Sequence, residues 1–399
     1  MEGLQTKCLV LVSEQVNATG GSPLHFVASA LLQSAMYMGL HRDPSHFSSN
    51  ISTFEGEMRR RLWLTIVEIH IQAALDEGMM SIISGDMYDT KPPLNVDDKD
   101  LDEDMVLLPR SKESSLWTQT SLQLVLQRSM GARLEILCSV NQPLYKLSYE
   151  ETLTLSTRLV KLCQDSDALL RQLGPPPAGY ASSPFYLNML NCLLRRFVLA
   201  LHRPFVGANM IDSRFYYSRK ICLENSLALT LPESDETFHR LLVVGQGLFR
   251  ETFQHAAVTI CIEMLLRLAE NAVDCYTARV NEAIGETFDK AVQSVLELNS
   301  QRLSNGETNI KGHVYLSMAL AQIKATQAHR DPKPHMVHAA KESATFCLQL
   351  LQKVASDADL LLNGNSILPE NDVTDQWSID DLGLELIPFH LDTLDLWDF

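Results

Sequence analysis

Apolar side chains recur every three or four residues through most of this chain, which is the spacing of one face of an α-helix. Between residues 22 and 39 that face consists of Leu24, Val27, Ala28, Leu31, Ala35 and Met38. Ser22 has the side chain of an N-cap, Pro23 suits the first helical position, and Gly39 suits a helix stop. The pattern therefore predicts a helix over residues 22–39.

A second helix is predicted over residues 55–78, with acidic side chains at its positive dipole end. Its apolar face consists of Met58, Leu62, Ile66, Ile69 and Ala73. The pattern breaks between residues 84 and 112, where a glycine, two prolines and an acidic run predict a long surface connection.

The rest of the chain is also helical in pattern. Ser148 with Glu151 fits a capping box, and Gly174 followed by three prolines predicts a hard stop. Further helices are predicted over residues 114–139, 149–173, 184–201, 213–229, 239–271, 280–303, 312–328 and 335–356. Because no segment alternates like a strand, the predicted fold class is all-α.

The chain has 399 residues, of which 46% are hydrophobic, enough for a large core. We expect one helical domain over residues 1–356, followed by a linker and tail over residues 357–399. No apolar stretch approaches the roughly 18 residues that would suggest a membrane span, so no membrane contact is expected.

The formal charge is −16, from 33 basic and 49 acidic residues. This balance repels polyphosphate, and the sequence has no basic patch to overcome it. The eight cysteines are scattered, and no C-x-x-C pair occurs. Neither a zinc site nor another cofactor is expected within this chain.

Four segments carry a family resemblance in the same order along the chain. They read MGLHRDP from Met38, EMRRRLW from Glu57, PPLNVDD from Pro92 and LHRPF from Leu201. They resemble the middle homology region of fungal zinc-cluster transcription factors, known as the fungal-specific transcription-factor domain. The residues that match its motifs are Gly39, Leu40, His41, Arg42, Arg59, Arg60, Arg61, Trp63, Pro93, Asp98, His202, Arg203 and Pro204.

The sequence also departs from that family. Glu68 and Ala73 stand near positions where the family usually has an aspartate and a serine, and residues 78–85 lack its Gly-Arg-Pro. The resemblance implies a six-cysteine zinc cluster and a basic linker before the segment Leu4–Val12, so the sequence is interpreted as N-terminally truncated. Zinc would be bound only by such a missing cluster, and DNA only through it or indirectly.

We weighed structural roles for the motif residues against functional ones. Arg59 and Arg61 lie four residues after Glu55 and Glu57, a spacing typical of a solvated helix face. Trp63 could line a ligand cavity, but a core position is favoured. His41 and Arg42 follow a helix end, where a cation can cap free carbonyls.

The acidic loop around Asp98 suggests metal binding at first sight. Counting from Asp98, the EF-hand positions for glycine and glutamate hold Glu103 and Pro109, which excludes that motif. The loop is also a near miss for the D-D-x-x-D motif of terpene cyclases, because Leu101 takes the third position and no second metal motif follows. We therefore expect no enzyme activity.

The C-terminal segment interleaves large apolar side chains with acids. From Asp372 to Phe399 there are eight acidic residues and no Lys or Arg. This composition is similar to acidic activation segments that dock on coactivators, and a terminal helix folded onto its own domain is the alternative. The candidate contact residues are Trp377, Phe389, Trp397 and Phe399.

The resemblance implies a nuclear transcription regulator with a helical regulatory domain and an acidic tail. Its expected partners are transcriptional coactivators or a full-length family member. The alternative is a partner-dependent or inert truncated regulator, and an all-α enzyme such as a terpene cyclase is a remote one.

Overall fold

The computed structural model describes residues 1–17, 23–47, 51–142, 147–206, 213–271 and 275–363. Within these ranges it contains twelve α-helices and short 3-10 turns, and no strand. The all-α fold class is thus confirmed. The chain divides into two compact units, each of which is described by itself.

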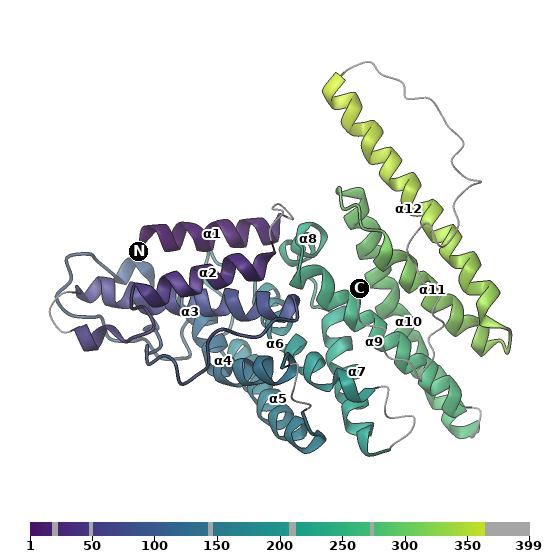
Figure 1. The fold of residues 1–399 in the computed structure, drawn as a ribbon, viewed down its shortest axis with the longest axis horizontal. Helices are drawn as coiled ribbons and strands as arrows, with labels where there is room; N and C mark the ends of the chain where they lie inside the picture. The colour runs from purple at the N-terminus through teal and green to yellow at the C-terminus, as the bar shows by residue number, and fades with distance from the viewer. Residues whose placement is uncertain (18–22, 48–50, 143–146, 207–212, 272–274, 364–399) are drawn as a thin grey trace. The chain divides into compact units, whose positions relative to one another are not determined.

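The first unit comprises residues 1–202, 233–241 and 245–251. Helix α1 (Glu2–Val16) packs on α2 (Leu24–Tyr37), and both contact α3 (Thr53–Asp76), as Figure 1 shows. Next come α4 (Ser121–Val140) against α3 and α5 (Tyr149–Gln172) against α4. Most of α6 (Ser183–Val206) also belongs to this unit.

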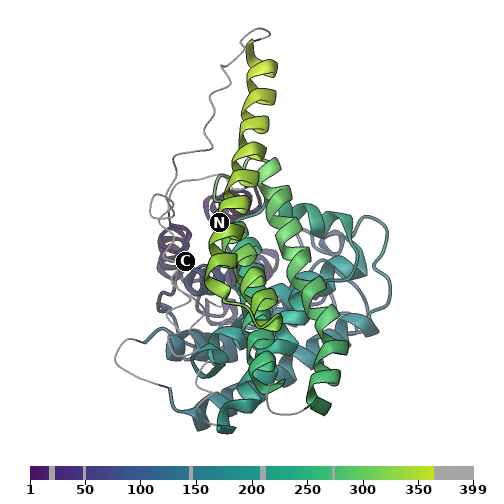
Figure 2. The same cartoon turned by 90° about the vertical axis from the view of Figure 1, so that its right-hand side faces the viewer.

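Of the described residues, the second unit comprises 203–206, 213–232, 242–244, 252–271 and 275–363. Its helices are α7 (Tyr216–Thr230), most of α9 (Leu248–Asn271), α10 (Cys275–Ser304), α11 (Lys311–Gln327) and α12 (Pro332–Asn363). Helices α11 and α12 form a hairpin, and the longer α12 extends beyond the N-terminal end of α11 (Figure 2). Val314, Met318, Met336 and Ala340 form the apolar seam of that hairpin.

Several predicted helix signals are confirmed. Gly39 has φ +74° and ends α2 in a Schellman motif, because its N–H bonds to the Met36 carbonyl and the Leu40 N–H bonds to the Ala35 carbonyl. Ser148 and Glu151 form the predicted capping box. Gly174 has φ +68° directly after α5.

Several predicted helix boundaries were wrong. The helix predicted from residue 114 begins only at Ser121, because polar side chains at 118–121 bond to a loop instead. The helix predicted over 239–271 is two helices, α8 (Glu236–Val244) and α9, separated by a turn in which Gly247 has φ +59°. Helix α6 runs past residue 201 and includes Pro204 in its last turn, where the proline removes one backbone hydrogen bond close to the helix end.

Candidate functional site: the arginine cluster of the first unit

Three consecutive arginines on α3 each hold a different segment of the first unit. Arg59 donates from Nη2 to the Met38 carbonyl at 2.8 Å, so it satisfies a carbonyl at the C-terminal end of α2. It also pairs with Glu55 at 3.5 Å. The capping role predicted for His41 or Arg42 is therefore carried out by an arginine from another helix.

Arg60 binds the carboxylate of Asp43 through two hydrogen bonds, of 2.9 Å from Nε and 3.0 Å from Nη2. Asp43 is fully buried, and it also accepts hydrogen bonds from the backbone N–H groups of Ser45 and Lys91. Burial raises the pKa of Asp43, but these hydrogen bonds outweigh it and hold the pKa well below its usual range. Asp43 thus organises the turn before Pro44, as predicted, and fixes it to α3.

Arg61 joins α3 to the acidic loop. It donates to Glu57 at 3.1 Å, to Asp98 at 2.6 Å and to the Val96 carbonyl at 3.3 Å. Glu57 is fully buried and also accepts the Leu94 N–H at 2.9 Å. Burial raises the pKa of Glu57 although Leu94 and Arg61 oppose that shift.

The solvated-face interpretation of this arginine run was wrong. The i,i+4 pairs with Glu55 and Glu57 do form, but the three arginine side chains are only 10 to 13% exposed. Spacing alone cannot separate a solvated ion pair from one that is covered by a loop. Residues 91–98 contact Arg61 and the acids that pair with Arg60 and Arg61, whereas Arg59 lies against Met38 and the Phe47 ring. The local sequence of α3 gives no sign of these contacts.

Trp63 lies in the core, as predicted, with no exposed surface. Its ring centroid is 5.6 Å from that of Tyr88 and 6.4 Å from that of His41. The indole N–H has no hydrogen-bond partner among the described residues. Trp63 therefore packs the loops at 41 and 88 against α3.

The remaining motif residues have separate positions. Leu40 and Pro93 are buried, and the Leu40 carbonyl accepts a 2.6 Å hydrogen bond from Thr90. Arg42 pairs with Asp89 at 3.1 Å on the surface. His202 is buried in the first unit with Nε2 2.7 Å from the Ser156 hydroxyl, whereas Arg203 and Pro204 belong to the second unit. The tail residues Trp377, Phe389, Trp397 and Phe399 lie outside the described residues.

The described residues contain no group of three His, Cys, Asp or Glu side chains arranged to hold a metal ion. The seven described cysteines are unpaired, and burial raises the pKa of several of their thiols. Asp98 and its neighbours Asp97 and Asp100 are held by Arg61 and Lys112. These contacts argue against a diphosphate-bound magnesium at this loop.

Buried histidines predict that the first unit loses stability at mildly acidic pH. Burial, with a smaller effect of His25, lowers the pKa of His70 to about 4, and burial lowers that of His202 to about 4. Because unfolded histidine titrates near 6.5, the unfolded state binds more protons between these values. We expect the urea midpoint to fall as pH is lowered from 6.5 towards 4.

The His70→Gln variant is the control, because Gln can still accept the Ile82 N–H that His70 Nε2 accepts at 3.3 Å. Its midpoint should depend less steeply on pH over the same interval. Equal slopes for the wild type and the variant would contradict the assignment.

The fold and the arginine cluster of α3 define, within the described residues, an all-helical protein in which buried charged side chains fasten loops to helices. The chain is 32% identical, over 94% of its length, to the transcription factor lepE of Aspergillus flavus. It is 29% identical over 85% of its length to the aspyridones cluster regulator apdR of Emericella nidulans. It is 28% identical over 61% of its length to the Zn(2)-C6 fungal-type transcription factor pigI of Monascus ruber.

These homologues, which cover most of the chain, are fungal transcription factors or cluster regulators, and one of them is named as a Zn(2)-C6 fungal-type factor, in agreement with the resemblance to a middle homology region. The chain spans about half the length of the first two relatives, 48% of each, and 31% of the third. No family model and no solved structure matches it. None of the helices in the described ranges could cross a membrane.

Proposed function

We propose that this chain is the helical regulatory part of a nuclear regulator of a fungal gene cluster, and that it is not an enzyme. The observation that carries the proposal is its similarity, over most of its length, to named transcription factors and a named cluster regulator. The net charge of −16 supports an indirect route to DNA, through a partner or a zinc-containing module, since the chain itself repels phosphate. In this proposal, the residues of this chain themselves bind no zinc.

The output segment in this proposal is the acidic tail, with Trp377, Phe389, Trp397 and Phe399 as the contacts to a coactivator. Acids without bases keep such a segment solvated, and aromatic side chains provide the apolar contact area when it docks. The partner is then a coactivator, or a full-length relative that supplies the promoter address.

The test is to delete the gene in its own fungus and measure all transcripts. We expect a set of neighbouring genes to change several-fold, and the wild-type chain to restore them. A chain with all four aromatic tail residues replaced by alanine should be present in the nucleus at normal level but fail to restore. An unchanged transcriptome after deletion would refute the function, whereas full rescue by the tail variant would refute only the role of the tail.

A further inference from the structure

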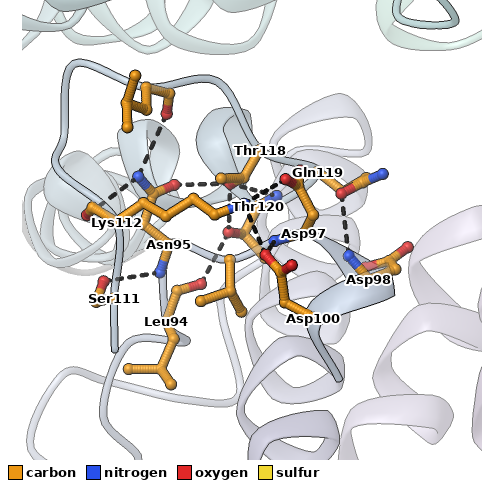
Figure 3. A network of polar contacts seen from close by, with 12 residues as sticks. Leu94, Asn95, Asp97, Asp98, Asp100, Ser111, Lys112, Thr118, Gln119 and Thr120 are labelled. Carbon is orange, nitrogen blue, oxygen red and sulfur yellow. Dashed lines mark hydrogen bonds and ion pairs between the residues drawn. The ribbon is translucent and has the colours of Figure 1, made fainter. Parts of the chain in front are cut away.

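The loop between α3 and α4 has a rigid base. The Asn95 side-chain amide donates to the carbonyls of Glu113 at 2.9 Å and Leu116 at 3.3 Å, and its oxygen accepts from Thr118 at 2.6 Å (Figure 3). The Lys112 N–H bonds to the Asn95 carbonyl at 2.9 Å. The two ends of the loop are therefore held next to each other.

Lys112 binds two acids at the base of the loop. Its ammonium group contacts Asp97 and lies 2.6 Å from Asp100 (Figure 3). Those two carboxylates hold the pKa of Lys112 above its usual range. Both of these acids at the base of the loop are thus paired with a base, whereas Asp102, Glu103 and Asp104 at the tip form no ion pair with the described residues.

The tip combines exposed acids with exposed apolar side chains. Asp102, Glu103 and Asp104 are exposed, and Val106 and Leu107 follow them at 85% and 83% exposure. These are among the most exposed large hydrophobic side chains of the described residues. Apolar side chains that are this exposed to water, on a base fixed by hydrogen bonds, are typical of a docking segment.

The backbone of the tip is also open to a partner. In the part of the chain that the structure describes, no N–H from Val106 to Ser111 donates a hydrogen bond, and the Val106 carbonyl accepts one from Thr53 Oγ1 at 3.0 Å. Free N–H groups beside apolar side chains allow the segment to pair as a short strand, with alternate side chains facing the partner. Pro109 lacks an N–H, so the pairing would end at Leu108.

We propose that residues 102–108 dock by strand addition on a partner protein whose β-sheet edge has an apolar groove with Lys and Arg along one side. The three acids precede the apolar residues and the exposed Arg110 follows them, so the basic side of the partner lies toward the N-terminal end of the segment. Nucleic acid and anionic membrane are excluded as occupants by the same acids. A small ubiquitin-like modifier, which combines such an edge and such a groove, is the partner class to which we commit.

The test titrates the full chain into a ¹⁵N-labelled fungal small ubiquitin-like modifier and follows its amide signals by NMR. We expect changes confined to the basic-rimmed sheet edge. The triple variant Asp102→Asn/Glu103→Gln/Asp104→Asn should bind about tenfold more weakly, with less dependence on salt. The double variant Val106→Asp/Leu107→Asp should not bind.

Leu116→Asp is the matched control, because Leu116 lies in the same connection at 51% exposure but outside the tip. It should bind like the wild type. All of these side chains are exposed, so thermal melts should show that each variant is folded. No signal change with the wild type, changes at another surface, or undiminished binding by the Val106/Leu107 variant would overturn the proposal. Transcription plays no part in this readout, so its failure is distinct from failure of the proposed function.

Discussion

Replacing Arg60 by alanine should lower the free energy of unfolding of the first unit by about 3–5 kcal/mol. The substitution removes the two-point hydrogen bond from Asp43, which has no exposed surface, and leaves its carboxylate with the backbone N–H and side chain of Ser45, the Lys91 N–H and a distant Lys91 ammonium group at 3.9 Å. The depressed pKa of Asp43 should rise at the same time, because Arg60 is the largest of the contributions that lower it. Urea unfolding and the pH dependence of its midpoint measure these two effects.

Arg42→Ala is the control for this prediction. Arg42 also pairs with an aspartate, Asp89, at 3.1 Å, but both side chains are substantially exposed. Such a surface pair contributes at most about 1 kcal/mol. Equal losses for the two variants would show that burial of the Arg60–Asp43 pair is not what matters.

Replacing Trp63 by alanine should cost about 3–5 kcal/mol of unfolding free energy, the usual range for deleting a fully buried large aromatic side chain. Trp63 fills the space between α3, the loop at His41 and Tyr88. The loss should appear in urea unfolding monitored by circular dichroism. The cavity should also loosen the loop at residues 84–98, which hydrogen exchange would detect.

Trp63→Phe separates packing from hydrogen bonding. The indole N–H has no partner among the described residues, so its removal deprives no acceptor, and this variant should lose clearly less than Trp63→Ala. Tyr37→Ala serves as the surface control, because Tyr37 is 94% exposed and its removal should leave stability nearly unchanged. A loss for Trp63→Phe as large as that for Trp63→Ala would point instead to an acceptor that the indole bonds.

If Arg60→Ala and Trp63→Ala behave as expected, the motif residues of α3 act mainly by fastening loops. Arg59 and Arg60 reach Met38 and Asp43 at the end of α2 and the turn after it, whereas Arg61 reaches Asp98 in the loop that follows α3. The transcript experiment can then use Arg60→Ala as a folding-deficient comparison for the tail variant. A regulatory defect in the tail variant without a stability defect would place the output in the tail.

Local signals in the sequence determined the all-α class and most of the helix ends. Gly39 and Gly174 adopt the positive φ that ends a helix, and Ser148 with Glu151 forms its capping box, because each depends only on residues within one turn. The ordered motifs also sufficed to recognise the family. The long connection at 84–112 was visible as a break in periodicity.

Tertiary structure alone decided what the charged residues do. The spacing of Glu57 and Arg61 is the same on a solvated face as under a loop, and only the fold brings Leu94 and Asp98 over them. Asn95 and Thr118 likewise make a predicted helix begin late, because their side chains meet across 23 residues of sequence. Burial depends on such distant contacts. The sequence therefore pointed to these residues but could not show that they fasten loops to helices.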